Sequence, residues 1–255
     1  MDIYVTQFIV YLLILVRVLS LITTAPIFGH SSIPNMTKIG LAGFASYLLY
    51  PIVSKNMGAI DLRLVPLVIM VLKEAFVGIL LGMAMGLIFA GIQYAGEIIS
   101  FTMGLSMMNI FDPESGQGTS VIGEFLYLFV ILVFLTINGH HYVLQAMQLS
   151  YHTSPIGTLA FSQPLYEVLM TLTVMLFVFA VKFAAPVMVA AFLMNVTFAI
   201  MARMMPAMNV FFVSAPASIG LGMIILMSLS PFVVFVFKKS LFVFEENINA
   251  LVAAL

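Results

Sequence analysis

The sequence predicts an all-α, polytopic helical membrane protein, and three observations support this class. Of its 255 residues, 63% are hydrophobic and only 7% are charged, whereas a soluble domain carries about 25% charged residues. The mean hydropathy is +1.20, and apolar runs long enough to cross a bilayer as helices recur along the chain. With a net charge of -1 and no basic run, nothing suggests a nucleic-acid partner. The absence of Cys excludes disulfides and thiolate metal sites.

Seven apolar runs predict helices, and segments rich in Gly, Pro and Ser separate them, as is typical of chain reversals. The expected helices lie near residues 4–28, 39–54, 64–90, 91–108, 121–138, 165–195 and 210–237. The main connections are expected at 26–34, 55–63 and 140–164. We interpret the first run as a retained helix, since Asp2 replaces the basic start of a signal peptide and Arg17 interrupts the run. No linker is evident, so one domain over residues 1–255 is predicted.

Residues 64–111 are too long to be one membrane span. A continuous helix would reach about 72 Å, more than twice the hydrocarbon core of about 30 Å. We therefore expect the chain to bend between Gly91 and Gly96, with residues 91–108 re-entrant, or to stand well outside a bilayer. Before that point a small residue recurs at every fourth position, which favours close contact with another helix. This ridge consists of Gly78, Gly82, Gly86 and Ala90.

Charged residues interrupt several apolar runs. Facing lipid, each would cost a few kcal/mol, so we expect them to face other helices, an aqueous path or a subunit interface. They are Arg17, Lys73, Glu74, Glu97, Lys182 and Arg203. The distribution of the other basic residues is too even to predict the membrane orientation.

The stretch from Gly91 to Ile122 combines a polar helical face with a segment that cannot remain helical. The face has one residue per turn: Gln93, Glu97, Ser100, Gly104 and Met107. The segment Asp112-Pro113-Glu114, followed by Gly116 and Gly118, then breaks the helix. In so apolar a chain, such a stretch must line water, face a partner or be buried with its polar groups satisfied. We therefore place the functional site here.

Two groups of side chains are candidates for chemistry, and neither carries a strong signal. His140 and His141 follow Asn138-Gly139, but adjacent histidines on a helix point about 100° apart, so a helix-end turn is the preferred interpretation. Asp112 and Glu114 lie on a glycine-flanked loop without the support that acid–base catalysis needs. No nucleophile with an adjacent base is evident. The sequence therefore predicts a protein that is not an enzyme and has no metal or cofactor.

Two further features suggest contacts with partners. Methionines gather beside two helix breaks, where flexible thioethers suit a deformable seal or subunit contact as well as core filling; they are Met103, Met107, Met108, Met201, Met204, Met205 and Met208. Residues 238–255 predict a short amphipathic helix on a membrane surface or a partner. Its apolar face consists of Leu241, Phe244, Ile248, Leu251 and Leu255.

The chain resembles the FliR-type family of flagellar export-gate proteins and its injectisome (SctT-like) counterparts in type III secretion. The resemblance lies in an ordered set of motifs over nearly the whole chain: Gln93-x-x-Gly96-x-x-Ile99, Asp112-Pro113, Asn138-Gly139-His140, Ala185-Pro186, Asn195, the run Arg203-Met204-Met205-Pro206-Ala207-Met208-Asn209-Val210-Phe211, and Pro216. In this family Gln usually follows the proline of the Arg-x-x-Pro run, so Ala207 is a departure.

The resemblance implies a non-enzymatic subunit of a gate in the bacterial inner membrane, at the flagellar basal body. Such gates are stacks of tilted helix hairpins, assembled from this subunit with several copies of FliP and FliQ and flanked by FlhB and FlhA. The resemblance implies that the gate sits partly above the plane of the inner membrane, contacts membrane lipid and passes secreted, unfolded proteins. Overall likeness favours a flagellum over an injectisome.

The resemblance also implies a channel plug over about residues 106–122. The plug residues carried onto this chain are Ser106, Met107, Met108, Asn109, Ile110, Phe111, Asp112, Pro113 and Glu114. We expect apolar occlusion to close the channel and the glycines to allow displacement. A second group is expected to form a polar helix face or subunit contact: Gln93, Gly96, Glu97, Ser100, Arg203, Pro206 and Asn209.

Two alternatives stay open. A stand-alone secondary transporter or channel would use a broken polar helix at 91–111, as transporters do at substrate sites, although the chain shows no inverted repeat. An intramembrane hydrolase using His140, His141 and Glu167 is the weakest alternative, because their spacing fits no known motif.

Overall fold

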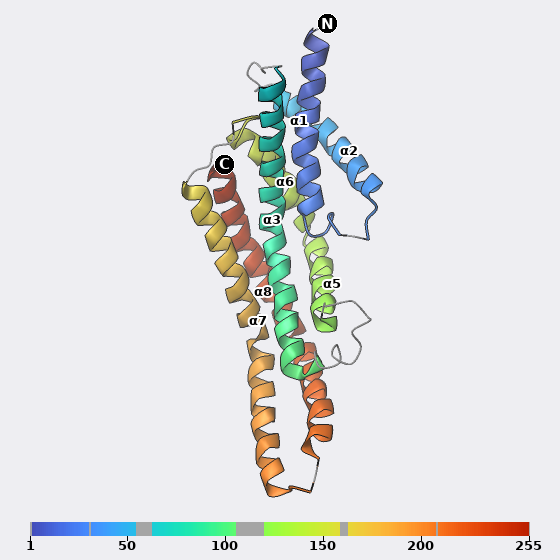
Figure 1. The fold of residues 1–255 in the computed structure, drawn as a ribbon, viewed down its shortest axis with the longest axis vertical. Coiled ribbons are helices and arrows are strands. Elements are labelled where there is room, and N and C mark those ends of the chain that lie inside the picture. The colour runs from blue at the N-terminus through green and yellow to red at the C-terminus, as the bar shows by residue number, and fades with distance from the viewer. Residues whose placement is uncertain are drawn as a thin grey trace. The chain divides into compact units, whose positions relative to one another are not determined.

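The computed structural model describes residues 2–30, 32–54, 63–105, 120–158, 163–207 and 209–254 (Figure 1). Within these ranges every regular element is a helix, which confirms the predicted all-α class. Five of these helices are long and apolar enough to cross a membrane, or up to six spans if the bent pair α5–α6 counts as one. The helices are α1 (Asp2–Thr24), α2 (Asn35–Val53), α3 (Leu64–Met103), α5 (Val121–Thr136), α6 (Gly139–Thr153), α7 (Gln163–Met204) and α8 (Val210–Ala254).

Helix α3 is continuous over 40 residues, about 60 Å, so the predicted bend at Gly91–Gly96 and the separate re-entrant helix at 91–108 are wrong. A glycine inside a helix costs only about 1 kcal/mol. Gly91 and Gly96 are both buried, and each lies against the backbone of another helix. The two glycines therefore permit close packing instead of breaking the helix.

Three other boundaries differ from the sequence predictions. Helix α7 extends past residue 195 to Met204, and α8 continues from the predicted 210–237 run to Ala254. Residues 238–255 are therefore not a separate short helix; through Ala254 they are the last turns of α8, where Leu251 is fully buried. The predicted connection at 140–164 contains the 15-residue helix α6. Hydropathy did not predict α6 as a helix, because its polar residues lower its hydropathy.

The chain forms two compact units. Unit 1 comprises Met1–Ile88, Phe134–Thr173 and Phe242–Leu255, and unit 2 comprises Phe89–Val133 and Val174–Leu241. Both units therefore combine segments that lie far apart in the sequence.

In unit 1, α3 packs closely against α1 along the predicted small-residue ridge. A Cβ at Gly82 would lie 2.8 Å from the Leu21 carbonyl oxygen, and one at Gly78 would collide with the Arg17 carbonyl and lie 3.1 Å from the Leu21 nitrogen. Gly86 is the looser end of the ridge, because the nearest atom to its Cβ position, Thr24 O, is 3.9 Å away. The prediction of close helix contact is confirmed at Gly78 and Gly82.

The turn between α5 and α6 follows the predicted helix stop at Asn138. Asn138 has φ 59° and ψ 30°, the left-handed conformation that Asn tolerates better than most residues. The two helices meet there at 73°. Gly139 lies against the ring of Phe134, where a Cβ would come 2.7 Å from its Cζ. The helix-end turn predicted for this motif is therefore confirmed.

Candidate functional site

The end of α3 meets the start of α5 at two glycines in unit 2. A Cβ on Gly96 would collide with the Gly123 backbone, lying 2.6 Å from its nitrogen and 3.1 Å from the carbonyl carbon of Ile122. A Cβ on Gly123 would lie 3.1 Å from the Gln93 carbonyl oxygen. These backbone atoms cannot move aside as a flexible side chain could. The two helices therefore touch at a distance that only glycine permits.

Ser120 joins the same two helices through its hydroxyl group. It is the residue before α5, and its Oγ accepts a hydrogen bond from the Gly123 amide at 3.0 Å, which is an N-cap. The same Oγ lies 2.6 Å from the Ser100 hydroxyl and 3.2 Å from the Gly96 carbonyl oxygen on α3. One hydroxyl group thus caps α5 and holds it to α3. We call Gly96, Ser100, Ser120 and Gly123 the α3–α5 junction.

Helices α7 and α8 support the same end of α3. Gly91 lies against α7, with the Leu176 carbonyl oxygen 3.2 Å and the Phe179 ring 3.4 Å from its Cβ position. Met103, the last residue of α3, is 1% exposed and packs over Gly222 of α8, where a Cβ would lie 2.6 Å from its sulfur. Gly104 then ends the helix with φ +82°, a conformation that glycine adopts without strain.

Two of the residues predicted for a polar helix face instead belong to contacts within the chain. Gly96 and Ser100 are buried at the α3–α5 junction, while Gln93 and Glu97 are half-buried. For this stretch the sequence allowed contact with water, contact with a partner, or burial with satisfied polar groups. Ser100 shows the third outcome. The predicted plug residues, Ser106 through Glu114, lie outside the described residues, as does the rest of the segment up to residue 119.

Arg203, Pro206 and Asn209 lie at the turn between α7 and α8, and all three are exposed. Arg203 is in the last turn of α7, so its charge is not buried within this chain. The structure therefore does not bring these residues to the α3–α5 junction as one site within unit 2. Their predicted role in subunit contact stays a prediction.

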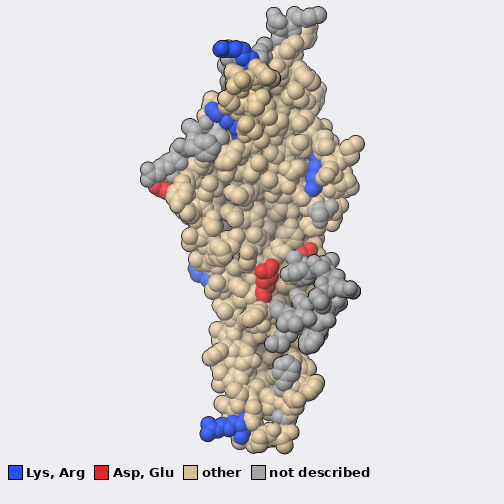
Figure 2. Space-filling model, viewed as in Figure 1, with Lys and Arg blue, Asp and Glu red and all other residues tan. Residues whose placement is uncertain are grey.

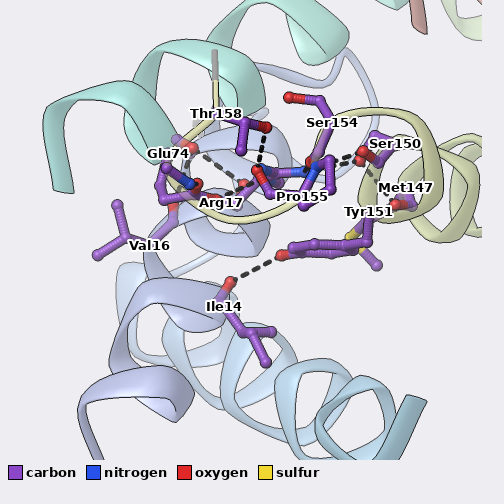
Figure 3. A network of polar contacts seen from close by, with 12 residues as sticks. Ile14, Val16, Arg17, Glu74, Met147, Ser150, Tyr151, Ser154, Pro155 and Thr158 are labelled. Carbon is purple, nitrogen blue, oxygen red and sulfur yellow. Dashed lines mark hydrogen bonds and ion pairs between the residues drawn. The ribbon is translucent and has the colours of Figure 1, made fainter. Parts of the chain in front are cut away.

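A second polar cluster, in unit 1, links three segments that the sequence did not connect (Figure 3). Arg17 of α1 donates from Nε to Glu74 of α3 at 2.6 Å, and both side chains are buried. Its Nη1 donates to the Ser150 carbonyl at 3.2 Å, the Ser150 hydroxyl at 3.3 Å and the Ser154 carbonyl at 3.1 Å. The guanidinium also lies over the Tyr151 ring, 4.2 Å from its centroid.

The same cluster fixes the loop that follows α6. The second Glu74 oxygen accepts the Gly157 amide at 2.9 Å, and Lys73 donates to the Gly157 carbonyl at 3.0 Å. Gly157 has φ +81°, which favours glycine there. The expectation that Arg17, Lys73 and Glu74 face other parts of the protein is confirmed. The sequence offered no signal for their partners, because Ser150 and Ser154 lie more than 130 positions from Arg17.

The two histidines lie at the start of α6. Their rings are 4.3 Å apart and tilted by 53°, and His140 is half-buried while His141 is exposed. In the part of the chain that the structure describes, no group of three or more His, Asp or Glu side chains could hold a metal ion. Figure 2 shows that charged side chains are sparse on the face it views.

The fold and these buried contacts define a polytopic, all-helical membrane protein whose described polar clusters join helices to one another. The model of one family matches residues 8–243 of this chain, and its description is "Bacterial export proteins, family 1". The chain belongs to that family.

Three curated relatives illustrate the similarity, and each is a flagellar biosynthetic protein FliR. The protein from Bacillus subtilis (strain 168) is 30% identical over 250 residues, covering 95% of this chain and 93% of the relative. The Pectobacterium carotovorum protein is 31% identical over 218 residues, and that of Escherichia coli (strain K12) is 29% identical over 221 residues. Both alignments cover 86% of this chain and 83% of the relative. The resemblance to the FliR-type family is therefore confirmed.

Proposed function

We propose that this chain is a non-enzymatic subunit of the flagellar type III export gate in the bacterial inner membrane, at the flagellar basal body. With FliP and FliQ it would form the channel through which unfolded proteins are secreted, with FlhB and FlhA beside it. The family match over residues 8–243 carries the proposal. The similarity to FliR proteins supports the flagellar assignment.

The length of α7 supports assembly with other proteins. The stretch of α7 from Lys182 to Arg203, both exposed, is about 32 Å long. The stretch from Leu165 to Lys182 adds about 26 Å of apolar helix. A hydrocarbon core of about 30 Å can cover one of these stretches but not both. Both stretches expose large apolar side chains, such as Phe192 between Lys182 and Arg203 and Phe177 between Leu165 and Lys182. The stretch outside the lipid needs a protein partner.

Helix α8 carries a similar excess of apolar surface. Within its candidate span, Phe212–Phe242, 11% of the most apolar window is buried inside the chain. That span is about 46 Å long, again more than one hydrocarbon core. FliP and FliQ are the partners that the family resemblance implies for this surface.

The plug is the finer part of the proposal. Of the expected plug, residues 106–119 would lie inside the closed channel, where Met107, Met108, Ile110 and Phe111 exclude water and ions. Residues 120–122 instead form the cap and first turn of α5. The polar residues Asp112 and Glu114 would end the apolar part. What supports this role is the family resemblance together with the apolar, glycine-flanked composition of the segment.

The alternative of a stand-alone transporter loses its main support. That interpretation needed a broken polar helix at residues 91–111, but α3 runs without a break through Met103. Of its polar residues, Ser100 is engaged with Ser120 at the start of α5.

Co-purification tests the subunit assignment. A tagged chain isolated in mild detergent should co-purify with FliP and FliQ as one hetero-oligomeric complex. Isolation of the chain alone or only as a homo-oligomer, from cells that express all three proteins, would contradict the proposal.

Ion leakage tests the plug. Replacing residues 106–119 with a Gly-Ser linker should raise sodium or proton leakage across the membrane. This replacement keeps Ser120 and therefore the cap of α5. A Gly-Ser linker in place of residues 55–62, which lie between α2 and α3, serves as the control. Normal assembly with unchanged leakage would count against the plug.

A further inference from the structure

We infer that the α3–α5 junction is a fixed seat that stays closed while a protein passes through the gate. The inference rests on the proposed function, because it assigns positioning residues to the two ends of the proposed plug segment. The junction joins the last turns of α3 to the first turn of α5, and these turns flank residues 106–119. The question is whether opening separates the two helices.

The contacts at the junction argue against separation. Gly96 and Gly123 meet backbone to backbone, so the contact has no flexible side chain that could stretch or repack. Parting them would also remove the Ser120–Ser100 hydrogen bond and expose Ser100, which is 2% exposed. Buried hydroxyl groups are costly to leave without partners in a protein interior.

The helices behind the junction hold it from two more directions. Gly91 packs on α7, and Met103 packs over Gly222 of α8. Ile92 and Ile99, one turn before and one turn after Gly96, are completely buried. A movement of α3 away from α5 would disturb all of these contacts together, and close-packed cores resist such displacement.

Gly104 ends α3 just beyond the seat, with its amide donating to the Phe101 carbonyl at 3.1 Å. It is exposed, a Cβ there would meet nothing within 4 Å, and its φ of +82° is freely accessible to glycine. A change of chain direction at Gly104 leaves Ser100 and the Gly96–Gly123 contact untouched. The fixed seat therefore comprises α3 up to Met103 and α5 from its cap at Ser120.

A disulfide across the junction tests this inference directly. The Ser100 and Ser120 oxygens are 2.6 Å apart, near the roughly 2.05 Å that separates bonded sulfurs, and the wild-type chain has no Cys. The S100C/S120C variant, expressed in cells with the whole gate, should cross-link on oxidation. Secretion of a flagellar substrate should then remain at the level of the reduced variant. The single variants S100C and S120C are the controls.

Two results would overturn the inference. One is secretion that falls to the level of a strain lacking the gate when the pair is oxidised and recovers when it is reduced. The other is an assembled gate in which the two cysteines do not cross-link, since the contact would then be absent from the complex.

The same variant separates the inference from the plug proposal. Replacing residues 106–119 by a Gly-Ser linker in the cross-linked variant should raise ion leakage, because the seat holds the ends but does not itself seal the channel. If leakage stays low while secretion survives cross-linking, the plug assignment fails and the seat stands. A G96A variant provides an independent readout: it should leak ions with the plug sequence intact, whereas G40A should not, because nothing lies within 4 Å of a Cβ at Gly40.

Discussion

Arg17 and Glu74, 57 positions apart in the sequence, form a buried ion pair with Nε and Oε2 2.6 Å apart. Neither side chain is more than 1% exposed. Because burying two charges costs several kcal/mol per ion, such a pair persists only when further hydrogen bonds satisfy it. Ser150 and Ser154 supply such bonds to Arg17 Nη1 and Gly157 to Glu74, while Arg17 Nη2 has no hydrogen-bond partner among the described residues. The pair therefore links α1 and α3 to the end of α6.

Removing one charge should damage the protein more than removing both. In Glu74→Gln, the Arg17 guanidinium stays buried without a carboxylate, and we expect a loss of about 3–5 kcal/mol in the free energy of unfolding. The double variant Arg17→Met/Glu74→Leu should lose less, since no unpaired charge remains. Thermal unfolding of the detergent-solubilised protein measures both. Glu246→Gln, at an exposed position, is the control. A double variant less stable than Glu74→Gln would contradict this account.

The glycine ridge of α3 should tolerate alanine at one end only. Gly82→Ala places a methyl group 2.8 Å from the Leu21 carbonyl oxygen, whereas at Gly86 the nearest atom is 3.9 Å away. We expect Gly82→Ala to destabilise by about 1–3 kcal/mol through overpacking. Gly86→Ala should be neutral or stabilising, by up to about 1 kcal/mol from helix propensity. The midpoint of thermal unfolding measures the difference, and equal midpoints would exclude close α1–α3 contact.

The left-handed backbone at Asn138 predicts an unusual order of substitutions. Asn138→Gly should be tolerated, because glycine adopts φ 59° without strain. Asn138→Val should cost about 1–2 kcal/mol, since a β-branched residue resists this conformation. Protein yield and unfolding temperature report the difference. A valine variant as stable as the glycine variant would mean that the α5–α6 turn has another conformation in the membrane.

The cap of α5 should depend on the hydroxyl group of Ser120. Ser120→Ala removes the acceptor for the Gly123 amide and the link to Ser100, and we expect a loss of about 1–2 kcal/mol. Ser120→Thr keeps the oxygen and should retain most of the stability. Hydrogen exchange of the Gly123 amide checks the cause: it should accelerate in the alanine variant and not in the threonine variant.

Several features could be predicted from the sequence because they depend on local composition and spacing. Hydropathy predicted the helical membrane class, the small residues at every fourth position predicted the α1–α3 contact at Gly78 and Gly82, and Asn138-Gly139 predicted the helix stop. The family was evident from an ordered set of motifs, and the family comparison bears it out. Each signal is contained within one segment of the chain.

Helix ends and the long-range partners of polar residues were harder to predict from the sequence. The length limit of a bilayer suggested a break at Gly91–Gly96, but packing against α5 and α7 keeps α3 continuous there. Helix α6 was missed because its polar residues resemble those of a loop. They become favourable only when the Arg17 guanidinium lies beside Ser150. The same holds for Ser100, whose polar group is matched by Ser120 and not by water.

The sequence alone determined that this chain is a helical membrane protein, because apolar composition and helical periodicity act on each segment independently. Its ordered motifs carried the resemblance to the export family. Only the tertiary structure decided that Arg17 pairs with Glu74 and that Gly96 meets Gly123. Those pairings join residues far apart in the sequence. Many partners of the same chemical type are available to each, and close packing selects one of them.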